Sequence, residues 1–133
     1  MKIVRFEDIE AWKASRRLLR QIHLITSSQG FRQNAELRSQ LRRAANSAMA
    51  NIAEGFNAGS DMEFARFLRI SRRSATEVQS HLYSALDQGH ITQDDFDRLY
   101  GIAEDVKKLI GGFVRYLSTT NRQARPPLTK TED

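Results

Sequence analysis

The first 125 positions of the chain contain no proline, so no part of them is barred from a long helix. The two prolines, Pro126 and Pro127, stand together near the C-terminus. Over the proline-free part, apolar residues recur at steps of three and four, which is the period of an amphipathic helix, and no strand-like alternation interrupts them. The pattern therefore predicts an all-α fold.

Capping residues and glycines divide this pattern into four helices. Asn34 is a predicted N-cap of the second helix and Thr92 of the fourth. Ser60 and Glu63 fit a capping box ahead of the third helix, and Gly89 fits a stop after it. We expect helices over residues 7–26, 34–56, 61–88 and 93–118.

The helices have similar lengths and short connections, which favours antiparallel neighbours. Each contains roughly 20 to 28 residues and would span about 30 to 40 Å at 1.5 Å per residue. We predict one domain, an antiparallel up-down-up-down four-helix bundle over residues 1–119. The polar segment 120–133 is predicted to be a flexible tail.

Composition narrows the class of protein further. The chain has 133 residues, a net charge of +5 and no cysteine, which removes disulfides, thiolate metal sites and cysteine nucleophiles. No apolar run is long enough for a signal peptide or a membrane span, so we expect a cytoplasmic protein without a membrane partner. The positive charge favours an acidic partner, nucleic acid first.

No recognised catalytic pattern is present. Di-iron bundles need two Glu-x-x-His elements, and the nearest match here is Glu77 with His81, at the wrong spacing. No Gly-x-Ser-x-Gly elbow and no phosphate-binding glycine loop occurs. We expect no enzymatic activity, no metal, no cofactor and no small-molecule substrate.

Basic residues cluster on the predicted helix faces and are candidates for contact with nucleic-acid phosphates. They are spread over the first three helices, whereas acidic residues offset the basic ones on the fourth. Solvated surface, or ion pairs with the fourth helix, would explain the same pattern. The candidate contacts are Lys13, Arg16, Arg17, Arg20, Arg38, Arg42, Arg66, Arg69, Arg72 and Arg73.

The segment from the second helix into the third carries two distinctive runs, Asn51-Ile52-Ala53-Glu54-Gly55 and Phe64-Ala65-Arg66-Phe67-Leu68. With the opening Phe6, Ile9 and Trp12, they resemble the four-helix-bundle family found as reading frames in intervening sequences of 23S ribosomal RNA genes. The resemblance covers about residues 6–117. It implies a homo-oligomer, in rings of five in the family, without an established activity. A distant relative, the accessory protein of diversity-generating retroelements, makes a nucleic-acid role plausible by analogy.

This chain departs from the family pattern at three places. Ala48 stands where a larger aliphatic residue is usual, and Ser71 and Arg73 stand where small residues are common. We expect the motif residues to set bundle register or a subunit interface. Polar contacts are predicted from Gln40 or Arg43 to Ser74 or Glu77, and from Asn51 or Glu54 to Arg66. The register and assembly candidates are Gln40, Arg43, Asn51, Glu54, Gly55, Ser74 and Glu77.

Apolar residues outside the inner stripes of the third and fourth helices, among them Met62, Leu109 and Tyr116, suggest a surface for self-association. The resulting hypothesis is a non-enzymatic oligomer that binds RNA or DNA backbone through a basic face. The alternative is a protein-only scaffold or adaptor that does not bind nucleic acid.

Overall fold

The computed structural model describes residues 3–119 and contains four long helices in that range. No strand occurs between residues 3 and 119, which confirms the all-α prediction. Two short 3₁₀ turns, η1 (Phe6–Asp8) and η2 (Gln29–Phe31), precede the first and second helices. The helices are α1 (Glu10–Thr26), α2 (Ala35–Phe56), α3 (Asp61–Asp87) and α4 (Gln93–Thr119).

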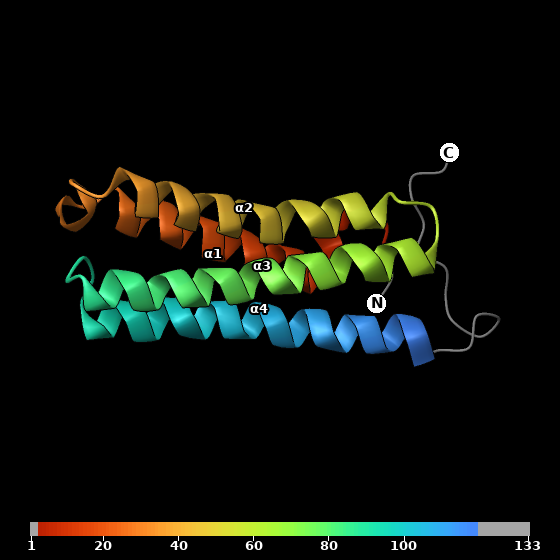
Figure 1. The fold of residues 1–133 in the computed structure, drawn as a ribbon. Coiled ribbons are helices and arrows are strands. Elements are labelled where there is room, and N and C mark those ends of the chain that lie inside the picture. Colours follow the sequence, from red (N-terminus) through yellow and green to blue (C-terminus); the bar gives the residue numbers. More distant parts are fainter. Residues whose placement is uncertain (1–2, 120–133) are drawn as a thin grey trace.

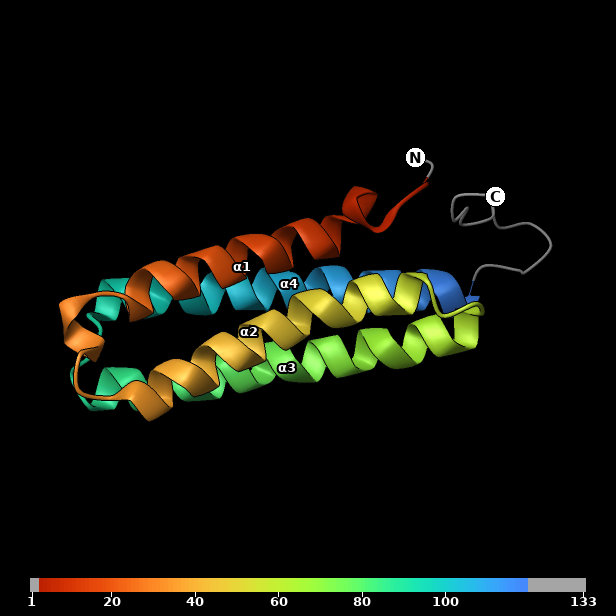
Figure 2. The same cartoon turned by 90° about the horizontal axis from the view of Figure 1, so that it is seen from above.

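Successive helices run in opposite directions and pack side by side, as the two views of the ribbon show (Figures 1 and 2). Each helix contacts the next one along the chain, and α1 closes the arrangement against α4. The α1–α2 and α3–α4 connections meet at one end of the bundle, here called the two-loop end. The α2–α3 connection lies at the opposite, one-loop end. The predicted tail, 120–133, lies outside the described residues.

Most helix ends follow the predicted caps. Asn34 Oδ1 accepts a hydrogen bond from the Leu37 amide at 3.1 Å, and Thr92 Oγ1 accepts one from the Asp95 amide at 3.0 Å. Each cap satisfies an amide that has no partner within its own helix. The second and fourth helices therefore begin where the sequence predicts.

The capping box before α3 is only half formed. Ser60 Oγ accepts from the Glu63 amide at 3.1 Å, as predicted. The Glu63 carboxylate, however, pairs with Arg66 at 3.1 Å. Because the carboxylate is held by a guanidinium one turn ahead, the return bond of a capping box is replaced by an ion pair within the helix.

The first helix begins later than predicted, because η1 interrupts the chain before it. Asp8 Oδ2 accepts from the backbone amides of Val4 at 3.0 Å and Arg5 at 3.2 Å. These two bonds lower the pKa of Asp8 below its ordinary value. Phe6 then packs edge-on against Trp12, with ring centroids 5.1 Å apart. The segment folds back on α1, so the helix starts at Glu10.

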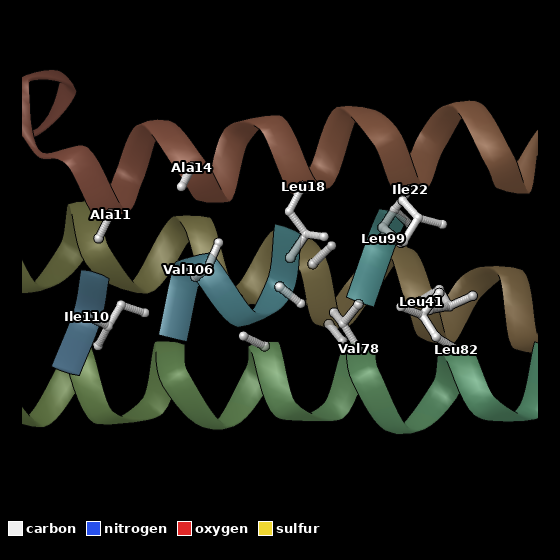
Figure 3. Packing of buried hydrophobic residues seen from close by; sticks show 14 of the residues in the cluster. Ala11, Ala14, Leu18, Ile22, Leu41, Val78, Leu82, Leu99, Val106 and Ile110 are labelled. Carbon is white, nitrogen blue, oxygen red and sulfur yellow. The ribbon is translucent and has the colours of Figure 1, made fainter. Parts of the chain in front are cut away.

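All four helices contribute to one apolar core, shown from close by in Figure 3. Leu18 and Ile22 of α1 point into the space between the helices, as do Leu41, Leu82 and Leu99 of the other three helices. All five side chains are fully buried. The core therefore runs along the bundle between the four helices rather than between pairs.

The interface between α2 and α3 is the most extensive of the helix pairs. A Cβ atom added at Gly55 would lie 2.7 Å from Cβ of Phe67 and 2.8 Å from Cδ1 of Phe64. Further along, Ser71 is fully buried and donates a hydrogen bond to the carbonyl oxygen of Ala48. The two departures from the family pattern, at positions 48 and 71, thus meet each other across this interface.

We expect Gly55→Ala to lower the free energy of unfolding by about 1–3 kcal/mol, because the added methyl group overlaps two phenylalanine side chains. Urea denaturation measures the change. Gly101→Ala is the matched control, since a Cβ at exposed Gly101 meets nothing within 4 Å and alanine gains up to about 1 kcal/mol in helix propensity. Equal stability changes at the two positions would contradict close α2–α3 packing.

Candidate nucleic-acid interface

Charge is divided unevenly between the two halves of the bundle. The stretch from α1 through α2 has eight basic and three acidic residues, whereas the stretch from α3 through α4 has eight basic and nine acidic. The expectation that three helices supply the positive field was therefore too broad, since α3 has four residues of each sign. The basic residues of the first stretch are Lys13, Arg16, Arg17, Arg20, Arg32, Arg38, Arg42 and Arg43, and we call them the α1–α2 basic side.

The basic side chains of α1 are exposed. Lys13 pairs with Glu10 at 3.3 Å, but Arg17 and Arg20 have no ion pair with any residue from 3 to 119. The Arg16 guanidinium lies 5.9 Å from the centroid of the Trp12 ring, which orients it without neutralising its charge. A shallow hollow of about 400 Å³ runs along this face.

Two α2 arginines have a second, structural role. Arg42 donates from Nε to Thr26 Oγ1 at 2.9 Å and from Nη2 to Ser27 Oγ at 3.0 Å. Arg38 donates from Nη1 to the Phe31 carbonyl at 3.1 Å. Both side chains are half-buried and fasten the α1–α2 connection to α2. Their partners are neutral, so both guanidinium charges remain uncompensated.

The predicted contacts on α3 form a separate group. Arg66 is paired with Glu63 and lies 4.7 Å from the centroid of the Phe67 ring. Arg69, Arg72 and Arg73 are exposed. Because α3 packs between α2 and α4, and α1 between those same two helices, α1 and α3 lie diagonally across the bundle. The ten predicted contacts therefore do not share one face.

Sequence reasoning left two arginines out of the basic side. Arg32 lies in the α1–α2 connection, outside any helical stripe, and Arg43 had been assigned to the register group. Arg32 would have been included if basic residues in the connections had been counted together with those on the helix faces. Both side chains are exposed, and both border the residues that fasten this connection.

Register residues of the α2–α3 hairpin come together, but through other bonds than those predicted. Ser74 Oγ lies 2.8 Å from Ser47 Oγ, and Asn51 Nδ2 donates to the Ser47 carbonyl at 2.9 Å and to its hydroxyl at 3.0 Å. Ser47 takes part in all of these hydrogen bonds, and it was not among the site residues predicted from the sequence. Ser74 was predicted to contact Gln40 or Arg43 and contacts Ser47 instead, so the pairing is displaced from the predicted register by four residues, or about one helical turn.

The remaining register candidates lie around that contact. Gly55 is buried in the interface and Gln40 is half-buried, whereas Arg43, Glu54 and Glu77 are exposed. Glu77 Oε2 lies 3.3 Å from Nε2 of His81 in its own helix. This pair gives a metal only two donors, and residues 3–119 contain no group of three or more metal-ligating side chains.

The chain resembles known proteins in both sequence and fold. The profile described as 23S rRNA-intervening sequence protein matches residues 7–112. The chain belongs to this family. The crystal structure of a protein of unknown function from the S23 ribosomal protein family of Bacteroides thetaiotaomicron is similar to it, with 22% identity and a TM-score of 0.70.

That likeness covers 79% of this chain and 95% of the other, so it extends over nearly the whole bundle. At this level of identity it shows the shared fold alone. The chain matches no curated protein sequence. No helix within residues 3–119 is long and apolar enough to cross a membrane.

In this family member, a buried amide organises the opposite side of the bundle, between α3 and α4. Gln79 is 4% exposed, donates from Nε2 to Glu104 Oε1 at 3.0 Å, and accepts from Lys107 Nζ at 3.0 Å. The hydrogen bond from Gln79 lowers the pKa of Glu104, although desolvation opposes it and nearby Lys107 reinforces it. Lys107 thus lies beside a carboxylate, 3.8 Å from Glu104 Oε1.

The lowered pKa predicts an acid-sensitive contribution to stability. A carboxyl group whose pKa is depressed by folding stabilises the protein fully above its ordinary value of 4.5, and this contribution disappears as the pH falls through the folded-state pKa. Glu104→Gln should therefore flatten the fall in the free energy of unfolding below pH 4.5. Urea denaturation at a series of pH values tests this.

Asp105→Asn is the matched control, since Asp105 is the exposed neighbour of Glu104 and makes no side-chain bond with residues 3–119. If the pH dependence of the free energy of unfolding changes as much in Asp105→Asn as in Glu104→Gln, the contact with Gln79 does not have the role assigned to it.

Proposed function

We propose that this protein is a non-enzymatic, cytoplasmic homo-oligomer that binds the phosphate backbone of RNA or DNA through its α1–α2 basic side. The proposal rests on the lack of carboxylate partners for the basic residues on that side. Of its eight basic residues, only Lys13 is ion-paired with another residue between 3 and 119. On the α3–α4 side, Arg66, Arg98 and Lys107 all have carboxylate partners.

Uncompensated arginines on an exposed helical face suit phosphodiesters, because neutralising phosphates releases the counterions condensed on a nucleic acid. Sequence readout is not expected. Trp12 lies beside Arg16, and its packing against Phe6 and Arg16 leaves it little freedom to stack on a base. Binding should therefore be insensitive to base sequence and strongly dependent on salt.

The analogy to the accessory protein of diversity-generating retroelements is consistent with a nucleic-acid role, and remains an analogy. A protein-only scaffold is the alternative, in which the same basic side meets an acidic protein. The two functions differ in one measurable property. Backbone binding predicts that generic RNA is bound at low salt, and a scaffold predicts that it is not.

Self-association is proposed through an apolar groove at the one-loop end, with a pentamer expected from the family resemblance. The groove has a volume of about 380 Å³ and lies between the start of α1 and the late turns of α4. Ile9, Leu109, Phe113 and Tyr116 are among its lining residues, and Leu109 is 40% exposed. A second copy would cover these side chains, and repetition of the basic side around a ring would strengthen backbone binding through avidity.

Replacing arginines on α1 should weaken RNA binding. We expect the double variant Arg16→Gln and Arg20→Gln to bind generic single-stranded RNA less tightly. The slope of log affinity against log salt should fall by about 0.7 for each phosphate that the variant no longer neutralises. Fluorescence anisotropy over a range of salt concentrations measures both quantities.

The same change of charge on α3, Arg69→Gln with Arg73→Gln, should have a smaller effect, because α3 has as many acidic as basic residues. Absence of RNA binding by the folded wild-type chain at low salt would refute the nucleic-acid function. Equal decreases in affinity for the two double variants would refute its assignment to the α1–α2 basic side.

A charge in the apolar groove should break the assembly. We expect Leu109→Lys to lower the molar mass measured by light scattering to that of a monomer, because a second copy covering the groove would then bury a charged ammonium group beside Ile9, Phe113 and Tyr116. Leu24→Lys is the control, since Leu24 is 68% exposed and lies outside the groove. A wild-type chain that is monomeric at high concentration would contradict self-association altogether.

A further inference from the structure

A second hollow, of about 510 Å³, lies at the two-loop end, where α1 passes into α2. Hydroxyl groups of Ser27 and Ser28 line one part of it, and Arg32, Arg38 and Arg42 line another. No carboxylate is among its lining residues. Three positively charged side chains therefore border a common space without an internal counter-charge, whereas the Ser28 hydroxyl donates to the Ile25 carbonyl at 2.6 Å.

Two of the three guanidinium groups are held in place by the backbone and by hydroxyls. Arg42 is fixed by Thr26 and Ser27, and Arg38 by the Phe31 carbonyl. A guanidinium has five N–H donors, so these contacts leave at least three on Arg42 and four on Arg38 for a ligand. The donors are thus pre-positioned, which reduces the entropy lost on binding.

Arg32 distinguishes a binding site from a local structural contact. Of the three arginines, only Arg38 and Arg42 bond to the α1–α2 connection. Arg32 is exposed, makes no side-chain hydrogen bond or ion pair with residues 3–119, and still lines the same hollow. Adding its charge to two others is unfavourable unless an anion occupies the space between them.

We infer that this hollow binds a phosphate monoester. A dianionic phosphate offers oxygens on all sides to the planar forks of several arginines and to the Ser27 hydroxyl, which accepts from Arg42 and keeps its own hydrogen to donate, whereas a phosphodiester has one charge. A neighbouring hollow of about 460 Å³ is lined by the same Arg38 and Arg42, together with His23 and Asn46. It provides room for the group that the phosphate is attached to.

This inference goes beyond the proposed function, which needs only open contact with phosphodiesters. The monoester could be the 5′-phosphate of a nucleic-acid strand or a small phosphorylated compound. Both present the same dianionic group to the hollow. The two sources differ in whether phosphorylation of a strand end improves its binding.

Titration with inorganic phosphate at constant ionic strength tests the hollow itself. Proton–nitrogen correlation spectra should show saturable shifts at the amides of Ser27 and Ser28 and at the Nε groups of Arg38 and Arg42. Arg32→Gln should weaken this binding about tenfold, the value of one charge-assisted hydrogen bond. Lys108→Gln, which removes the same charge from exposed α4 outside the hollow, should leave it unchanged.

Arg38→Gln provides a second test, with thermal unfolding recorded for each variant so that loss of folding is not read as loss of binding. The inference would be overturned if the shifts fail to saturate or are spread evenly over the basic residues. It would also be overturned if the affinity for phosphate is unaltered in Arg32→Gln and in folded Arg38→Gln.

Two single-stranded RNAs of one sequence, with 5′-phosphate or 5′-hydroxyl ends, identify the source. If the phosphorylated strand binds more tightly, and this preference is lost in Arg32→Gln but kept in Lys108→Gln, the hollow binds strand ends. Equal binding of both strands, with adenosine 5′-monophosphate shifting Ser27 and Ser28, assigns it to small compounds. If phosphate saturates the hollow and neither RNA binds at low salt, the proposed function fails while this inference stands.

Discussion

Without a side chain at position 55, the last turn of α2 rests directly on Phe64 and Phe67 of α3, and this contact sets the register of the bundle. Once α2 and α3 are aligned there, Ser71 reaches the Ala48 carbonyl and Ser74 reaches Ser47 two turns and more away. These are buried or half-buried polar groups that bond only in one alignment. A shifted register would leave several of them unsatisfied at once.

The order of the helices then separates the charges. Because α1 packs on α2 and lies diagonally from α3, the basic residues of α1, of the first connection and of α2 gather on one side. Carboxylates are concentrated on the other two helices, where Gln79 joins α3 to Glu104 and Lys107 of α4. The result is a bundle whose two halves differ in charge although each has eight basic residues.

Local patterns predicted the fold well, because caps and apolar periodicity depend on neighbours in sequence. Asn34, Ser60 and Thr92 begin their helices as expected. The late start of α1 was missed, since it depends on Asp8 accepting two backbone amides in a 3₁₀ turn. Which basic residues share a surface was predicted only in part, because that depends on which helices are diagonal. Ser47 was missed because a serine in mid-helix gives no signal of its partner.

The two ends of this bundle are chemically unlike, with arginines and hydroxyls at the two-loop end and an apolar groove at the one-loop end. Closed rotational symmetry places equivalent points of all subunits on a single circle. In a cyclic assembly, the arginine-lined hollows would therefore form one rim with a constant spacing. The constant separation between neighbouring hollows would then favour ligands whose phosphates are the same distance apart. Selection would depend on this spacing as well as on the charge of the ligand.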